Sequence, residues 1–206
     1  MRIKKLAAAL ALAWMSSTAM AQNAILVNEY VKAGVNETTG TLGSGGNTPP
    51  GLQYDSTGTG TFNAAYDYLT PGSPFEGFTV KVDGTSYRNN NAGNLAQIAG
   101  AWVGTPTSSS AVWNGSVTGV FGLRNTYSLA AGQQYIGIQT RIEVTNPVAN
   151  LYFARYIDPD ARAAAGDSSV TTMCVDIRVS QQPTWCSQRP WPVVMPWVSI
   201  PVKWAV

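Results

Sequence analysis

The chain has 206 residues, and only 12% of them are charged. It contains no histidine, which excludes a Ser-His-Asp triad, a Cys-His pair or a histidine-bearing zinc site within this chain. Three of its thirteen basic residues lie before position 6, so the rest of the chain has ten basic and eleven acidic residues and is close to neutral. It contains no block of basic residues that would indicate nucleic acid as a partner.

The first element along the chain is a predicted secretory signal peptide. Three basic residues precede an apolar run from Leu6 to Met15, and small residues follow up to Ala21. That run is shorter than the ~20 residues needed to cross a bilayer. We therefore predict a signal peptide helix at 1–21, no transmembrane segment in the mature chain, and a periplasmic, cell-surface or extracellular location.

The sequence pattern at 22–172 predicts one β-rich domain. Short β-prone runs alternate with turns rich in glycine, asparagine and proline, which predicts an all-β, antiparallel β-sandwich. The strand candidates are 24–31, 60–69, 75–84, 85–89, 111–123, 135–144 and 151–157. The clearest is 135–144, where apolar and polar residues alternate strictly. Asp83-Gly84 indicates a hairpin turn, and 94–102 is the only helix candidate, although Gly100 weakens it.

Three aspartates near the end of the last strand candidate could bind a metal. Asp158, Asp160 and Asp167 offer oxygen ligands of the kind that Ca²⁺ prefers. The alternative is that Asp158-Pro159-Asp160 forms a turn in which the carboxylates cap backbone amides. The spacing does not fit an EF-hand loop, and apart from this Ca²⁺ site no cofactor is expected.

Two stretches, YDYLTPGSPFEGFTV at 66–80 and IEVTNPVANLYFARYIDPD at 142–160, resemble β-sandwich, supersandwich-like modules of exported, surface-associated bacterial proteins. The resemblance covers about 25–160. It implies a fold and an exported location, and it carries no catalytic residue. In such modules the DPD turn is followed by asparagine- and glycine-rich sequence and further strands, a pattern from which this chain departs.

The tail at 173–206 differs abruptly from the rest, with five prolines, four tryptophans and no glycine. One interpretation is an irregular native extension, in which a Cys174–Cys186 disulfide closes a short loop worth roughly 3 kcal/mol and the tryptophans form a binding surface. The other is a frameshift near Thr172, because another reading frame permits codons that restore glycine-rich, alternating sequence. The domain would then be a truncated sandwich with an unpaired edge.

Two functions fit these observations. The first is a non-catalytic structural or interaction module of an exported protein, whose partner is a cell-surface polymer or glycan. The second is a carbohydrate-binding or carbohydrate-processing domain, in which Glu76 and Asp67 do acid-base work. The aromatic residues that could stack on sugar rings in this domain are Trp102, Trp113, Tyr66, Tyr68 and Tyr87. The competing interpretation of these aromatics is core packing, because they occur within strand candidates.

Overall fold

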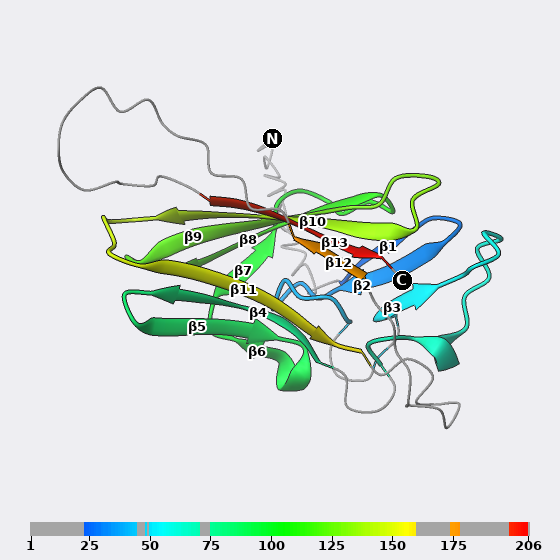
Figure 1. Ribbon diagram of the computed structural model, residues 1–206, viewed down its shortest axis with the longest axis horizontal. Coiled ribbons are helices and arrows are strands. Elements are labelled where there is room, and N and C mark those ends of the chain that lie inside the picture. Colours follow the sequence, from blue (N-terminus) through cyan, green and yellow to red (C-terminus); the bar gives the residue numbers. More distant parts are fainter. Residues whose placement is uncertain are drawn as a thin grey trace, which may run out of the picture.

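The computed structural model describes residues 23–44, 48, 50–70, 75–159, 174–177 and 198–205, the last two ranges by their backbone alone. The described chain is all-β, and its strands pair antiparallel in three sheets. Two sheets face each other as the layers of a sandwich, and the third lies at one end (Figure 1). Within the described part of the chain, no helix is long and apolar enough to cross a membrane.

The end sheet has the order β1-β2-β3, with β1 (Ala24–Val27), β2 (Val31–Val35) and β3 (Leu52–Tyr54). One layer has the order β11-β4-β5-β6, with β11 (Leu151–Asp158), β4 (Phe75–Val82), β5 (Thr85–Asn90) and β6 (Leu95–Ala96). The facing layer has the order β12-β13-β10-β9-β8-β7, with β12 (Cys174–Ile177), β13 (Val198–Ala205), β10 (Tyr135–Val144), β9 (Phe121–Ser128), β8 (Ser110–Val117) and β7 (Ala99–Trp102). Two short 3-10 helices, η1 (Ala64–Tyr66) and η2 (Ala92–Asn94), complete the described elements.

The strongest sequence patterns produce the predicted strands. In β10 the even-numbered positions from Ile136 to Ile142 are buried, whereas Gln139, Arg141 and Glu143 are exposed, so the alternation places one side toward the core. β4 alternates in the same way only from Phe78 to Val82, where Phe78, Val80 and Val82 are buried and Lys81 is exposed. A two-residue turn with positive φ at both positions follows β4, as predicted at Asp83-Gly84 (44° and 92°).

Four local predictions were wrong. Run 111–123 is not one strand, because a turn at 118–120 divides it between β8 and β9. Run 24–31 is not one strand, because the Asn28 side chain accepts hydrogen bonds from the amides of Tyr30 and Val31 and turns the chain between β1 and β2. Run 60–69 contains η1 instead of a strand. Run 94–102 is not a helix and contains the short strands β6 and β7.

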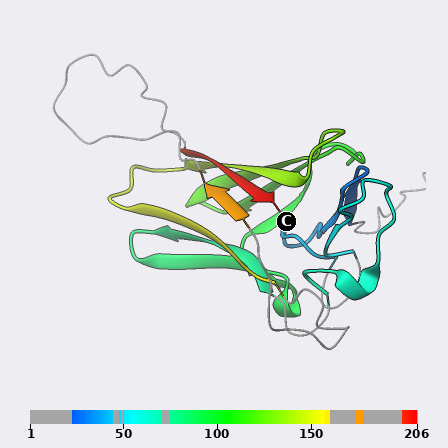
Figure 2. The ribbon, with the colours of Figure 1, turned by 45° about the vertical axis from the view of Figure 1, so that its right-hand side comes forward.

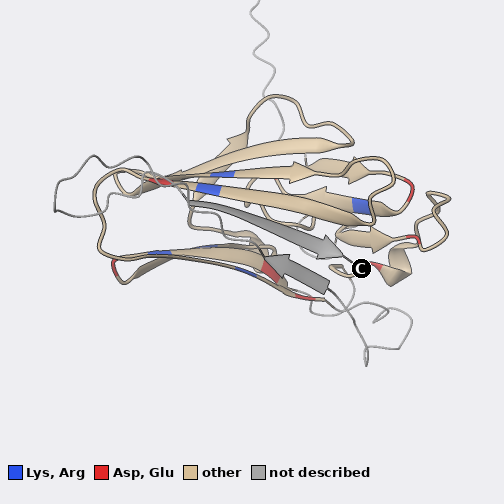
Figure 3. Ribbon diagram, turned by 45° about the horizontal axis from the view of Figure 1, so that its top comes forward, with Lys and Arg blue, Asp and Glu red and all other residues tan. Residues whose placement is uncertain are grey.

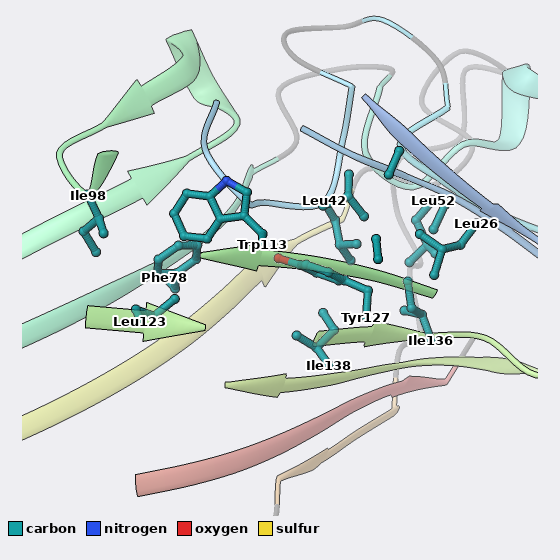
Figure 4. Close-up of a cluster of buried hydrophobic side chains, with 14 of the residues drawn as sticks. Leu26, Leu42, Leu52, Phe78, Ile98, Trp113, Leu123, Tyr127, Ile136 and Ile138 are labelled. Carbon is teal, nitrogen blue, oxygen red and sulfur yellow. The ribbon is translucent and has the colours of Figure 1, made fainter. Parts of the chain in front are cut away.

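The core lies between the layers and is centred on Trp113 of β8. Its indole packs edge-on against Phe78 of β4, with ring centroids 6.1 Å apart, and Figure 4 shows Phe78 between this indole and Leu123 of β9. Glycines make room for this indole: a side-chain carbon on Gly100 or Gly115 would lie only 2.2 or 2.3 Å from it. Gly100, which lies in β7, therefore leaves the space that the Trp113 indole needs.

The tail contributes two strands, which departs from the expected irregular structure and unpaired edge. β13 pairs along β10 from Tyr135 to Ile142, and β12 pairs with β13. Figure 2 shows β13 in red and β12 in orange beside the layer that contains β10. The frameshift hypothesis itself stays a prediction, and the predicted signal peptide at 1–21 lies outside the described residues.

Candidate functional site

The carboxylate of Asp67 is committed to backbone structure. It is fully buried, and each of its oxygens accepts two hydrogen bonds. Oδ2 accepts from the Gly51 amide (2.8 Å) and Gln53 Nε2 (2.9 Å), and Oδ1 accepts from the amides of Leu52 (3.0 Å) and Leu69 (2.8 Å). Asp67 thus joins β3 to the chain after η1 and has no free lone pair directed toward a substrate.

The carboxylate of Glu76 is equally committed. Its Oε1 lies 2.6 Å from Nε of Arg155, its Oε2 accepts from the Leu42 amide at 2.6 Å, and both side chains of the ion pair are fully buried. Burial raises the pKa of Glu76, while the charge of Arg155 opposes that rise. Burial alone would lower the pKa of Arg155, but the charge of Glu76, together with Tyr127 and the hydrogen bonds to both, raises this pKa above its ordinary value. The pair joins β4 to β11 inside the sandwich.

Residues 36–42, which we call the central segment, run between the layers and are held there by buried side chains. Among the bonds that hold it are those from Trp113 Nε1 to the Glu37 carbonyl (2.6 Å), from Asn89 Nδ2 to the Thr39 carbonyl (2.8 Å), from the Tyr127 hydroxyl to the Gly40 carbonyl, and from the Leu42 amide to Glu76. Burial raises the pKa of Tyr127 to about 12, so its hydroxyl remains a donor at neutral pH. These polar groups stabilise the interior.

The five candidate sugar-stacking aromatics do not form one platform. Trp113 is fully buried, which confirms core packing for that residue. Tyr68, Tyr87 and Trp102 are partly buried and pack against the core, and only Tyr66 is well exposed, at 45%. Trp102 also borders a hollow.

The predicted metal and disulfide sites lie mostly outside the described residues. Asp158 ends β11 and is exposed, whereas Asp160 and Asp167 are not described. Cys174 begins β12, described by its backbone, and Cys186 is not described. Among the residues that the structure does describe, no three potential metal-ligating side chains gather. Both sites stay predictions.

The loop at 55–61, with the sequence DSTGTGT, wraps around the carboxylate of Asp55. Oδ1 accepts from the amide and hydroxyl of Thr57 (2.9 and 2.6 Å), and Oδ2 accepts from the amide and hydroxyl of Thr59 and the amide of Thr61 (all 3.0 Å). The hydrogen bond from the Thr57 hydroxyl, helped by the others, holds the pKa of Asp55 well below its ordinary value of 3.8. Asp55 therefore organises its own loop.

A shallow groove of about 430 Å³ lies on the outer side of the layer that contains β8, β9 and β10. We call it the outer groove. Its side chains stand in two cross-strand rows: Asn114, Arg124 and Arg141 in one, and Ser116, Gly122 and Glu143 in the other. Figure 3 shows basic segments side by side on neighbouring strands of this layer. Sequence alternation already assigned Arg141 and Glu143 to one side of β10, but it could not reveal that β9 places Arg124 beside them.

A second hollow, of about 620 Å³, lies between the start of β1 and the loop after β7. We call it the edge hollow. Its lining includes Trp102, Glu37, Thr105, Pro106 and Thr107.

Comparison of the chain with family models, with curated proteins and with solved structures found no match. The geometry of these two hollows is therefore the basis for a functional assignment.

Proposed function

We propose that this chain is a non-catalytic interaction module of an exported bacterial protein. The observation that carries the proposal is the contrast between buried and exposed polar groups. Asp67 and Glu76, the pair considered from the sequence for acid-base work, have their carboxylate oxygens occupied by internal hydrogen bonds and an ion pair. The outer groove instead exposes charged side chains on a rigid sheet, which suits binding.

The test is a combined binding and turnover screen with the full chain. Purified protein is applied to an array of glycans and cell-surface polymers, and the same preparation is assayed for hydrolysis of those polymers. We expect saturable binding without product formation. Turnover of a defined substrate by the folded protein, or the absence of binding to every polymer, contradicts the proposal.

Export is tested separately by fractionating cells that produce the full chain. We expect the protein in the periplasm or the medium, shortened by the 21 residues of the predicted signal peptide. A full-length product that stays in the cytoplasm contradicts this part of the proposal.

Carbohydrate binding in the edge hollow is a second candidate, favoured by one observation. Trp102 borders this hollow together with Thr105 and Thr107, so an aromatic ring lies near hydroxyl groups, a combination suited to sugars. Trp102→Ala should weaken glycan binding about tenfold, while Tyr66→Ala, an exposed aromatic that does not line the hollow, should leave it unchanged. Equal effects of the two variants on glycan affinity would argue against the edge hollow.

A further inference from the structure

The outer groove contains a glycine that neither packing nor turn geometry requires. A glycine inside a strand weakens it and is commonly found where another group approaches the backbone closely. Gly100 and Gly115 fit this rule internally, because Trp113 lies against them. Gly122 in β9 has no such neighbour: a side-chain carbon there would meet no atom within 4 Å. The space above Gly122 is thus open toward the solvent side of the sheet.

The same groove carries one excess positive charge. Arg124 and Arg141 are direct cross-strand partners on β9 and β10, a placement of like charges that destabilises a sheet. Arg141 is neutralised by Glu143, whose Oε1 lies 2.7 Å from Arg141 Nη2. Arg124 is exposed and forms no ion pair with any residue that the structure describes. A ligand with a single negative charge would therefore complete the groove.

We propose that the outer groove binds an acidic sugar, a saccharide unit with one carboxylate, which rests on the proposed role as an interaction module. Arg124 binds the carboxylate, since a guanidinium matches its geometry with two parallel hydrogen bonds. The sugar ring occupies the space above Gly122. Its hydroxyls are both donors and acceptors, and they meet the amide of Asn114, the hydroxyl of Ser116 and the carboxylate of Glu143.

The carboxylate of Glu143 distinguishes this ligand from an acidic peptide. A peptide with several carboxylates would place negative charge beside Glu143, at a cost that the single excess positive charge does not offset. A saccharide unit with one carboxylate and several hydroxyls binds Arg124 through its carboxylate and Glu143 through its hydroxyls.

Calorimetric titration of the full chain with aldotriouronic acid, a trisaccharide of two xylose units and one uronic acid that carries a single carboxylate, and with neutral xylotriose, at low and high salt, tests the inference. We expect binding of the acidic trisaccharide, at least tenfold weaker binding of the neutral one, and loss of affinity as salt rises. Arg124→Gln should weaken acidic-sugar binding at least tenfold. Arg88→Gln, which removes an exposed arginine from β5 in the other layer, is the matched control and should leave affinity unchanged.

Gly122→Val is the second variant, because it fills the open space without a clash. We expect an unchanged or higher melting temperature together with at least a tenfold loss of acidic-sugar affinity. Equal affinity for both trisaccharides, unaltered binding by Gly122→Val, or tighter binding of an acidic peptide would overturn the inference. If the chain binds other polymers but not aldotriouronic acid, the inference fails and the interaction-module role stands. If it binds nothing, both fail.

Discussion

The two sides of β9 show what polar residues do in this protein. On the inner side, Asn125 accepts from the Thr140 hydroxyl at 2.7 Å, and Tyr127 donates to the Gly40 carbonyl. On the outer side, Arg124 is exposed beside the open space at Gly122. The residue types alone do not separate these roles. On β9 the difference is that Asn125 and Tyr127 have hydrogen-bond partners within the fold, so the inner side stabilises, whereas the outer side is available for binding.

The largest expected effect comes from breaking the inner ion pair. Arg155→Met leaves the buried charge of Glu76 without its cation, which should lower the free energy of unfolding by about 3–5 kcal/mol in urea titrations. The double variant Glu76→Leu with Arg155→Met should recover much of that loss, because it removes both charges. Arg88→Met is the exposed control, and a loss in that variant as large as in Arg155→Met would remove the contrast between the two environments.

Tyr127 should make the protein sensitive to alkali. Its pKa is raised from 10.0 to about 12 by burial, so the folded state favours the neutral phenol. This contribution is fully present below pH 10 and is lost as pH rises through 12, by about 3 kcal/mol in total. Tyr127→Phe should start less stable by about 1 kcal/mol, since it lacks the bond to the Gly40 carbonyl, but should show a smaller alkaline loss. If the unmodified protein and Tyr127→Phe lose stability equally as the pH rises, Tyr127 is not the cause of the alkaline loss.

Two glycines sharpen the comparison of the inner and outer sides of the sheet. Gly115→Ala places a carbon 2.3 Å from the Trp113 indole and should cost about 1–3 kcal/mol, measured by thermal unfolding. Gly122→Ala meets open space and should gain roughly 0.4–1 kcal/mol by restricting the unfolded chain. If both substitutions destabilise equally, the outer side is as tightly packed as the inner one.

The smallest expected effect is at the loop around Asp55. Its pKa is lowered chiefly by the Thr57 hydroxyl, so its contribution to stability is present above about pH 3.8 and is lost as pH falls further. The melting temperature of the unmodified protein should therefore drop between pH 4 and pH 2 more than that of Asp55→Asn. Parallel pH profiles of the two proteins would show that this loop is stable without the carboxylate.

The sequence predicted the fold class and the strands in which apolar and polar residues alternate strictly, such as β10, and it predicted the Asp83-Gly84 turn. Alternation is a local signal that directly reflects which side of a strand faces the core. The predictions at 24–31 and 94–102 failed, because backbone amides donate to the Asn28 side chain in the first run and Gly100 makes room for Trp113 in the second. The outer groove was missed because it depends on the register between β9 and β10, which no single run reveals.

The central segment has a consequence for how the molecule opens. Bonds tie it to partners 34, 50 and 87 positions away in the chain, in both layers. Neither layer can separate from the other without breaking them, so the Leu42 amide should exchange its hydrogen with solvent only during global unfolding. Because contacts between such distant positions form late, we expect this protein to fold slowly.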